Sequence, residues 1–352
     1  MKHEKITTVK NLIIQKSGKE ALDYFSKFTD VESEKTFVFS STNIFNILNN
    51  NTKPNAIINL SRTNDIRFVN KFFEAVNSKL NNGDLYIGCL ETITSRMQRM
   101  PIGKIPFIGA IYFSLEFLFN RISPKIIGLK KVYFLLTRGR NRLLSKAEVL
   151  GRLVCCGFEI IEYESIKGLT YFVAKKIKEP VFDMNPSYGA LYKMPRIGKN
   201  GKIIGVYKMR TMHAYAEYLH SYILKVNGYA ESGKPADDFR LTPWGKFMRR
   251  YWIDELPQLI NVLKGELKLV GVRPISQRYF QDIPKDLQEL RLKHKPGCIP
   301  PYVALNRKGN VKSVLQSERE YLEEKTKHPY TTDTKYFFKA LYNIIIKRKR
   351  SA

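Results

Sequence analysis

The sequence contains few cysteines, and they do not form a recognisable ligand or disulfide pattern. Cys89, Cys155, Cys156 and Cys298 include no CxxC pair, and the five histidines form no HxxxH or HExxH set, so no structural zinc site is expected. Thiols in this arrangement suit a reducing cytosol. The first residues, MKHEKITTVK, lack an apolar core and a cleavage site, so no signal peptide is expected.

Acidic residues are also scarce. Sixty Lys and Arg residues stand against 32 Asp and Glu residues, which gives a formal net charge of +28. This excess predicts a polyanionic partner, either nucleic acid, an anionic lipid surface or a phosphorylated substrate. No helix-turn-helix, RNP or zinc-finger pattern is present, so nucleic acid is not the expected partner. A hydrophobic content of 43% excludes a disordered chain, and 352 residues predict two domains.

The first third of the chain alternates short β-rich runs with helical patterns. Residues 36–40, 56–60 and 84–88 have the composition of strands, and residues 65–80 carry apolar side chains at helical spacing. Strands separated by helices predict an α/β domain with a parallel, doubly wound sheet.

The end of this region predicts a closing hairpin. A helical pattern over 145–153 is followed by two strand-like runs, 157–161 and 170–174, an ending similar to that of methyltransferase-type Rossmann domains. No GxGxxG loop follows an early strand, so the element that grips a nucleotide or S-adenosylmethionine is missing. We therefore interpret residues 1–178 as a degenerate Rossmann-like domain. The alternative is a methyltransferase that uses S-adenosylmethionine and carries an accessory membrane-binding domain.

Residues 105–119, IPFIGAIYFSLEFLF, are the most apolar run of the sequence. The run contains Glu116, is shorter than the about 20 residues of a spanning helix, and is followed by a break at Ser123–Pro124. Its aromatic content and basic flanks predict a membrane-dipping insertion near 101–126. A buried helix of the Rossmann-like domain is the alternative, and the run alone does not decide between them.

The C-terminal residues 334–350, TKYFFKALYNIIIKRKR, predict a basic amphipathic helix. One predicted stripe contains apolar side chains at Tyr336, Phe337, Ala340, Leu341, Ile344 and Ile345. Lys347–Arg350 form a cationic tip, and each such charge contributes about 1 kcal/mol near anionic lipid. The alternative is a packed terminal helix with a solvated tail.

Polar motifs become dense after the linker at 175–180. The sharpest is DELPQLINVLKG at 254–265, in which a leucine-rich stripe, Pro257 and Gly265 predict a helix with Asp254 at or next to its N-cap. Backbone N–H groups and the helix dipole would keep the Asp254 carboxylate ionised. In isolation, this motif is explained as a well-capped helix.

The neighbouring motifs point to phosphate chemistry. Several guanidinium groups and an ammonium group bracket the adjacent carboxylates Asp254 and Glu255 in the sequence. Guanidinium groups bind phosphate in a bidentate manner, and carboxylates bind Mg²⁺. A carboxylate that attacks a diphosphate needs cationic clamps and a metal, and it forms a covalent phosphoryl-aspartate.

Five motifs in order resemble the bacterial sugar transferase family, the monotopic polyprenyl-phosphate phosphoglycosyl transferases. They are KMRTM at 208–212, Asp238-x-Arg240-x-Thr242, IDELPQ at 253–258, NVLKG at 261–265 and VGVRP at 270–274. The resemblance implies an α-rich α/β catalytic domain with membrane-associated helices, which we assign to residues 179–352. It also implies a monotopic enzyme at the cytoplasmic face of the bacterial inner membrane, and it leaves a homo-oligomer open.

The implied reaction moves a sugar 1-phosphate from a nucleotide diphosphate sugar, by family a UDP-sugar, to undecaprenyl phosphate. The product begins the synthesis of capsule, O-antigen, exopolysaccharide or another glycoconjugate. By resemblance, Asp254 is the nucleophile, Glu255 completes the acidic dyad, and both carboxylates hold Mg²⁺.

The resemblance also assigns phosphate-binding and supporting residues. Phosphate-binding or dyad-orienting roles fall to Arg273, Pro274, Lys208, Arg210, Arg249 and Arg196. Supporting roles fall to Asp238, Arg240, Gln258 and Asn261. For Lys208, Arg210 and Arg249 a surface salt bridge is the alternative.

The sequence departs from the family in two places. Cys298–Pro301 replaces the usual Ile-Thr-Gly. The re-entrant helix that relatives place directly before the catalytic block has no counterpart at 175–184, and residues 105–124 are the comparable segment. We expect that segment to have taken over the membrane role.

Overall fold

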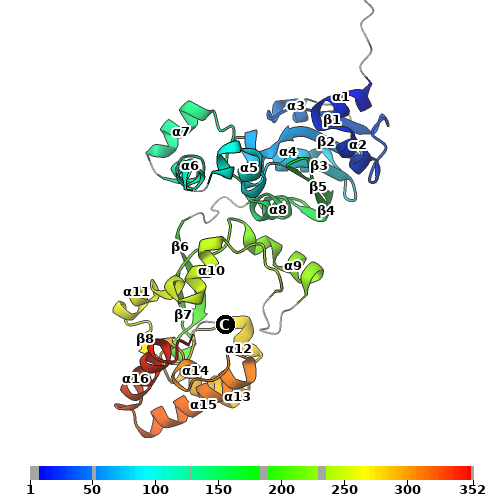
Figure 1. Ribbon diagram of the computed structural model, residues 1–352. Coiled ribbons are helices and arrows are strands. Elements are labelled where there is room, and N and C mark those ends of the chain that lie inside the picture. The colour runs from blue at the N-terminus through cyan, green and yellow to red at the C-terminus, as the bar shows by residue number, and fades with distance from the viewer. Residues whose placement is uncertain are drawn as a thin grey trace, which may run out of the picture. The chain divides into compact units, whose positions relative to one another are not determined.

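A computed structural model of the chain describes residues 8–49, 53–105, 107–126, 128–182, 189–228 and 235–349. Contacts divide the chain into two units (Figure 1). Unit 1 comprises Met1–Tyr188 and His213–Tyr222, and unit 2 comprises Gly189–Met212 and Ile223–Ala352. The sequence predicted one boundary, between residues 178 and 179. In the structure, the later segment His213–Tyr222 also belongs to unit 1. Within the described residues, no helix combines the length and apolarity needed to span a bilayer.

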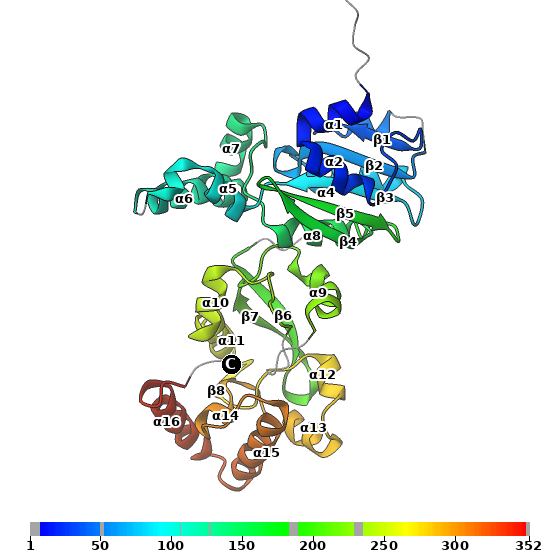
Figure 2. The same ribbon diagram turned by 45° about the vertical axis from the view of Figure 1, so that its right-hand side comes forward.

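Unit 1 is built on a five-stranded sheet with the order β1-β2-β3-β5-β4 (Figure 2). Its strands are β1 (Thr36–Phe39), β2 (Ala56–Arg62), β3 (Leu85–Leu90), β4 (Phe158–Ile166) and β5 (Leu169–Lys176). The first three strands are parallel, whereas β5 runs antiparallel to both β3 and β4. The predicted α/β class, early strands and closing hairpin are therefore confirmed.

Successive side chains of a strand point to opposite faces of the sheet, and in this sheet both sets are apolar. Helices therefore cover both faces. On one face, α1 (Val9–Ser17) and α2 (Lys19–Ser26) pack in one core cluster with Ile58, Ile87 and Val173. On the other face lies α4 (Val69–Lys79), whose Phe73 ring contacts the rings of Tyr86 and Phe172. Helix α8 (Lys146–Cys155) packs against α4 and β4. A short helix, α3 (Phe45–Leu48), precedes β2.

A helical insertion lies between β3 and α8. It contains α5 (Ile93–Arg99), α6 (Ile108–Phe117), a π-helical turn (Leu118–Ile122), a 3₁₀ turn (Ser123–Lys125) and α7 (Leu129–Thr137). The predicted break at Ser123–Pro124 is confirmed, since the helix gives way to the 3₁₀ turn there.

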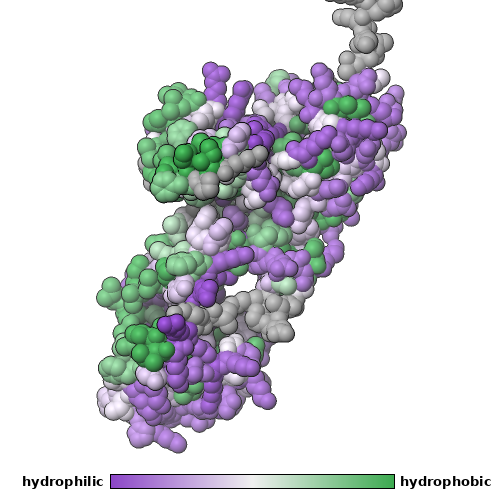
Figure 3. Space-filling model, in the orientation of Figure 1, coloured by the Kyte–Doolittle hydropathy of each residue, from purple (hydrophilic) through white to green (hydrophobic). Residues whose placement is uncertain are grey.

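The insertion exposes its apolar side chains. They form the hydrophobic surface over α6 and α7 in Figure 3, and include Phe107, Ile108, Ile111, Leu115, Leu129, Val132, Leu135 and Leu136. Glu116, the acidic residue of the run, is buried and pairs with Arg96 at 2.7 Å. The alternative of a buried Rossmann helix is therefore wrong, because this helix buries its charge and exposes its hydrophobic residues.

Unit 2 is α-rich and has two small sheets. Strands β6 (Leu191–Ile197) and β7 (Ile203–Met209) form an antiparallel hairpin, and β8 (Lys268–Val270) pairs in parallel with β9 (Gly297–Ile299). The helices are α9 (His220–Asn227), α10 (Pro243–Arg250), α11 (Gln258–Leu263), α12 (Gln277–Gln281), α13 (Lys285–Leu292), α14 (Pro301–Ala304), α15 (Val311–Lys327) and α16 (Thr332–Ile345). Helix α9 begins in unit 1 and continues in unit 2.

The C-terminal helix α16 does not carry a single apolar stripe. Tyr336 and Ala340 are buried in the core of unit 2, where the Tyr336 ring meets Tyr321 edge-on. Leu341 and Ile345, which were predicted to share that stripe, lie on the exposed side together with Phe338, Tyr342 and Ile346. The helix is therefore packed on one face and apolar on the opposite, exposed face.

Candidate active site

Asp254 and Glu255 lie in a single 3₁₀ turn, Ile253–Glu255, between α10 and α11. Trp252 precedes this turn in the left-handed region, with φ of 57°, and so ends α10 and redirects the chain. Helix α11 begins at Gln258, and no side chain caps it. The predicted position of Asp254 at or next to the N-cap is therefore wrong, because the chain first makes a 3₁₀ turn, closed by the Glu255 N–H bond to the Trp252 carbonyl, and Pro257 occupies the N-cap position.

Glu255 is held by three side chains. Lys208 Nζ lies 2.7 Å and Arg273 Nη2 lies 3.0 Å from Glu255 Oε1, and Gln258 Nε2 donates to Oε2 at 3.1 Å. Burial by itself would raise the pKa of Glu255, but Lys208 and Arg273 outweigh it, and the pKa lies below its ordinary value. Glu255 is therefore a fixed anion that orders the cations around it.

Asp254 differs from its neighbour. It is 8% exposed, and no ion pair or side-chain hydrogen bond involves its carboxylate among the described residues. Burial raises the pKa of Asp254, and the charge of Glu255 adds to this effect, whereas Lys208 and Arg249 oppose it. Two adjacent carboxyls are thus driven apart in pKa by their surroundings, an arrangement that gives such pairs different roles. Asp254 is the carboxylate left available to a ligand.

Strand β7 and helix α10 position two of the predicted cations. Lys208 lies on β7, and Arg249 donates from Nε to Thr211 Oγ1 at 2.9 Å. The start of α10 is fixed to the same residue, because Thr242 Oγ1 donates to the Thr211 carbonyl at 3.0 Å and caps Gly245 N–H. Arg249 therefore hydrogen-bonds to Thr211 and interacts electrostatically with Asp254.

Arg273 is placed by a close approach of two backbones. A Cβ at Gly297 would lie 2.2 Å from Gly271 N, so any residue larger than glycine at position 297 would clash with the facing backbone segment. Gly297 N–H donates to the Val272 carbonyl at 2.9 Å, and buried Pro274 follows Arg273. These contacts fix the loop from which Arg273 reaches Glu255.

The sequence did not identify two residues that belong to this site. Tyr192 lies directly across the β6–β7 hairpin from Lys208, and the charges of Arg249, Arg210 and Asp254 all act on its hydroxyl. Buried Arg291 donates to the Arg273 carbonyl and pairs with Glu318. The alternation of β6 could have indicated Tyr192, whereas no local signal marks Arg291.

Two predicted phosphate-binding residues make other contacts. Arg196 donates to the Pro195 carbonyl at 2.8 Å, and burial lowers its pKa. Arg210 donates to the Gly189 carbonyl at 3.0 Å and lies over the Tyr192 ring. These contacts are not with the dyad, so the phosphate-binding roles of Arg196 and Arg210 stay predictions.

The remaining supporting residues are structural. Asp238 and Arg240 form a buried pair at 2.7 Å that pins the loop before α10. Asn261 joins α11 to β7, since its Oδ1 accepts from Tyr207 N–H at 3.0 Å and its Nδ2 donates to the Gly205 carbonyl at 2.9 Å.

Helix α11 is inverted relative to an ordinary surface helix. Its polar Gln258 and Asn261 are 2% and 0% exposed, whereas Leu259 and Leu263 are 48% and 89% exposed. The predicted leucine-rich stripe is therefore present but faces outward. Together with α10 it forms an apolar face, visible over these two helices in Figure 3, made of Trp244, Phe247, Tyr251, Leu256, Leu259, Ile260 and Leu263.

The dyad offers few but suitable ligands for Mg²⁺. No group of three or more His, Cys, Asp or Glu side chains gathers to bind a metal within the described ranges. The oxygens available are those of Asp254, Glu255 and Gln258, whose Oε1 is buried without a hydrogen-bond partner. Mg²⁺ commonly binds one or two carboxylates and takes its other ligands from water and substrate phosphates, so this set fits that ion.

Comparison with known proteins finds a family match in the C-terminal part of the chain. A sequence model of the family described as bacterial sugar transferase matches residues 179–347. Over these residues, which make up slightly less than half of the chain, the sequence is similar to the bacterial sugar transferase family. The dyad, Lys208 and Arg273 all lie within the matched sugar transferase region.

Several curated relatives carry the same region. Galactosyl transferase CpsE of Streptococcus agalactiae is 41% identical over 109 residues, which are 31% of this chain and 24% of that protein. The undecaprenyl-phosphate galactose phosphotransferase of Salmonella typhimurium is 37% identical over 117 residues, 31% of this chain and 24% of its own length. The uncharacterized sugar transferase EpsL of Bacillus subtilis is 35% identical over 145 residues, 41% of this chain and 58% of its own length. The chain thus spans between about a quarter and three fifths of the length of these relatives.

Proposed function

We propose that this protein is a phosphoglycosyl transferase that moves a sugar 1-phosphate from a UDP-sugar to undecaprenyl phosphate. The observation that carries the proposal is the asymmetric dyad, in which Lys208, Arg273 and Gln258 hold Glu255 while Asp254 has no side-chain partner among the described residues. The name of the Salmonella relative, an undecaprenyl-phosphate galactose phosphotransferase, supports this substrate class.

The first half-reaction uses Asp254 as the nucleophile. A carboxylate oxygen of Asp254 attacks the phosphorus that bears the sugar, and the bond from that phosphorus to the bridging oxygen breaks. The bridging oxygen leaves with the electron pair as part of the nucleoside monophosphate, and a phosphoglycosyl-aspartate remains. Lys208 and Arg273 are cations at the site of this transfer, where they offset the repulsion between the carboxylate and the diphosphate.

The second half-reaction returns Asp254 to its free state. An oxygen of undecaprenyl phosphate attacks the same phosphorus, the bond to Asp254 breaks, and the product is a polyprenyl diphosphate sugar. Because Glu255 has a lowered pKa and two cationic partners, it orients Lys208 and Arg273 and does not remove a proton. Mg²⁺ held by Asp254, Glu255 and the Gln258 oxygen would neutralise diphosphate charge when bound.

The acceptor requires a membrane surface, and two exposed apolar surfaces support this location. One is the α10–α11 face beside the dyad, where leucines are exposed and amide side chains are buried. The other is the exposed face of α6 and α7 in unit 1. Exposed apolar and aromatic side chains flanked by basic residues are typical of interfacial, monotopic attachment. We place the enzyme on the cytoplasmic side of the inner membrane, where nucleotide sugars are made.

The test is to trap the intermediate. Purified protein is mixed with a panel of UDP-sugars, with and without Mg²⁺, and the peptide containing residue 254 is analysed by mass spectrometry. We expect a sugar-phosphate adduct on Asp254 with one UDP-sugar, and its loss when undecaprenyl phosphate is added. Asp282→Asn, at an exposed position, is the matched control and should still form the adduct. Turnover without any adduct on Asp254 would overturn the proposed mechanism.

The methyltransferase alternative concerns unit 1 only. In the sequence of unit 1, no GxGxxG loop follows an early strand, so the element that grips S-adenosylmethionine is missing. We therefore do not propose that activity.

A further inference from the structure

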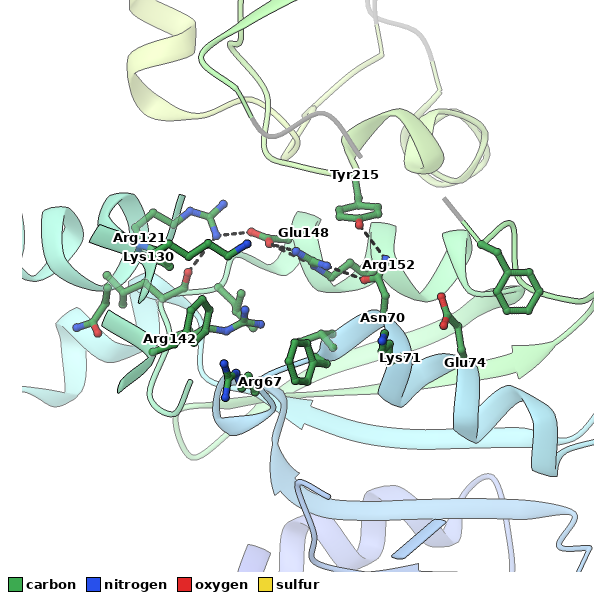
Figure 4. A pocket seen from close by; sticks show the side chains of 18 residues that line it. Arg67, Asn70, Lys71, Glu74, Arg121, Lys130, Arg142, Glu148, Arg152 and Tyr215 are labelled. Carbon is green, nitrogen blue, oxygen red and sulfur yellow. Dashed lines mark hydrogen bonds and ion pairs between the residues drawn. The ribbon is translucent and has the colours of Figure 1, made fainter. Parts of the chain in front are cut away.

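Unit 1 contains a pocket of about 520 Å³ that the proposed reaction does not use (Figure 4). Its wall is formed by the start of α4, the helical insertion, the segment before α8, α8 itself, Phe182 and Tyr215, which all belong to unit 1. Six cationic side chains but only two carboxylates line it: Arg67, Lys71, Arg121, Lys130, Arg142 and Arg152, against Glu74 and Glu148. The pocket is therefore strongly cationic.

Part of this charge is already neutralised. Glu148 is buried and accepts hydrogen bonds from Arg121 and, at 2.7 Å, from Arg152. Arg152 also donates to Asn70 Oδ1 at 2.6 Å and stacks on the Tyr215 ring. Glu148 is thus shared between two arginines, as the dashed lines in Figure 4 show.

Arg142 is the residue that this network leaves out. Its Nε and Nη2 atoms are buried and have no hydrogen-bond partner among the described residues. Burial lowers the pKa of Arg142 to about 10, and the nearby Arg152 charge adds to this effect, so the side chain still carries its proton at neutral pH. Buried polar groups in proteins nearly always have partners, and buried charges especially so.

The two unpaired nitrogens form one edge of the guanidinium group. Nε–H and Nη2–H point the same way and match two oxygens of a phosphate or carboxylate, which is the bidentate arrangement that makes arginine a preferred phosphate ligand. The first turn of α4, including Val69 and Asn70, also lines the pocket, and a helix N-terminus carries partial positive charge. The β2–α4 connection lies at the carboxyl end of a parallel strand, the edge at which open α/β sheets bind ligands.

We propose that this pocket binds the phosphate or diphosphate group of a ligand, with Arg142 as its bidentate contact and Lys130 and Arg67 beside it. The rings of Phe68, Phe134 and Tyr215 in the same wall give the ligand's uncharged part an apolar surface. The volume falls within the range of pockets for small ligands, about 300–1,000 Å³. In this site, side chains would hold the phosphate in place of the GxGxxG loop that the domain lacks.

The phosphate can come from two sources. A soluble nucleotide would place its base against the aromatic rings. A phospholipid headgroup would enter from the insertion, whose Arg121, Lys130 and Phe134 line the pocket while its other side chains form the exposed apolar surface of α6 and α7.

The experiment measures binding of inorganic pyrophosphate to the full-length protein by calorimetry. We expect Arg142→Gln to weaken binding about a hundredfold and Lys130→Gln about tenfold. Lys131→Gln, the next residue on the same exposed helix and outside the pocket, is the matched control and should change affinity less than about twofold. Unchanged binding in both Arg142→Gln and Lys130→Gln would overturn the proposal.

A second readout separates ligand binding from a structural role. If Arg142 is kept for a ligand, Arg142→Gln removes a buried unpaired charge, so the free protein should melt at the same or a higher temperature than wild type. Pyrophosphate should raise the melting temperature of wild type but not of this variant. A lower melting temperature with an intact pyrophosphate effect would mean that Arg142 is structural. If the variant does not fold, the Lys130→Gln and Lys131→Gln pair carries the test.

The catalytic site also attracts diphosphate, so all titrations are repeated with Arg273→Gln. The pocket should still bind pyrophosphate in that variant and lose it when Arg142→Gln is added. If Arg273→Gln alone abolished all pyrophosphate binding, the ligand would bind at the dyad, and the proposed pocket site would be wrong. In the same background, stronger binding of uridine diphosphate than pyrophosphate identifies a nucleotide, and binding of glycerophosphoglycerol identifies a lipid headgroup. Binding of none of the three probes would also overturn the proposal.

Discussion

Each unit of this protein holds a glutamate between two cations, buried in unit 1 and partly buried in unit 2, and the two clusters differ in which charged residue lacks a partner. In unit 1, Glu148 is shared by Arg121 and Arg152, and the residue left without a partner is a cation, Arg142. In unit 2, Glu255 is shared by Lys208 and Arg273, and the residue left over is an anion, Asp254. A spare guanidinium can bind an anion, whereas a spare carboxylate among cations can attack one. The same ion-pair arrangement therefore supports binding in one unit and catalysis in the other.

The sharpest test of this contrast is to remove the spare anion. Asp254→Asn keeps the shape of the side chain but not its charge, so we expect kcat to fall by about 10⁴-fold or more, as for other covalent nucleophiles. Because Asp254 has no side-chain partner, the melting temperature should stay close to wild type. The measurement is the release of nucleoside monophosphate together with thermal unfolding. A wild-type rate in this variant would exclude Asp254 as the nucleophile.

The strands and motifs of both units could be predicted from the sequence because their signals are local. The short β-rich runs that form β1 to β5 need no knowledge of distant contacts. The motifs that carry Lys208, Asp254 and Arg273 are also local, and their order along the chain suggested one site. Contacts made by the fold were not predictable in this way. Arg291 holds the Arg273 carbonyl from a helix eighteen residues away, and nothing in its own neighbourhood indicates this.

The direction that an apolar stripe faces could not be predicted from the sequence alone. Hydrophobic periodicity locates a stripe, but the same stripe can face a core or a membrane. For 105–119 the buried alternative was wrong, and for α11 the leucines point outward while Gln258 and Asn261 point inward. The amides between the leucines were the available clue, since a surface helix of a soluble protein would expose them.

The next largest effect is expected when the shared glutamates lose their charge. Glu148→Gln removes the carboxylate that buried Arg121 and Arg152 share, which should destabilise the fold by about 3 kcal/mol. Chemical denaturation measures this loss. The control is Glu20→Gln, which breaks an exposed ion pair with Lys167. This pair has the same 2.7 Å length as the Glu148–Arg152 pair, and its loss should cause no measurable change in stability. Equal effects of the two substitutions would mean that the Glu148 cluster is not buried in solution.

Glu255→Gln should act on both stability and catalysis. The variant frees Lys208 and Arg273 at the reaction site, so we expect kcat to fall by about 10²-fold, with destabilisation smaller than for Glu148→Gln because Arg273 is half-exposed. Adding Glu148→Gln should lower stability further without lowering kcat further. A drop in kcat from Glu148→Gln alone, measured well below its unfolding temperature, would show that the two clusters are coupled.

A smaller effect is expected from the outward leucines. Leu263→Gln removes an exposed apolar side chain from the α10–α11 face, so binding to vesicles containing anionic lipid should weaken by about tenfold. Stability should not change, because Leu263 is 89% exposed. Val311→Gln, at an exposed apolar residue at the start of α15, is the control and should bind vesicles like wild type. Equal vesicle binding by both variants would argue against the α10–α11 face as a membrane contact.

The last prediction concerns pH. The surroundings of the dyad shift the pKa values of its two acids in opposite directions. Since the pKa of Asp254 is raised by burial and by Glu255, the nucleophile is protonated at a higher pH than an ordinary aspartate, and kcat/KM should fall on the acid side as pH drops through that raised value. Lys208 opposes this shift, so Lys208→Met should move the acid limb of the profile to still higher pH. Lys202→Met, an exposed lysine in the turn before β7, should leave the limb where it is. An acid limb that does not respond to Lys208→Met would mean that Asp254 is not the titrating group, since Lys208 lies beside it and carries the largest favourable charge on it.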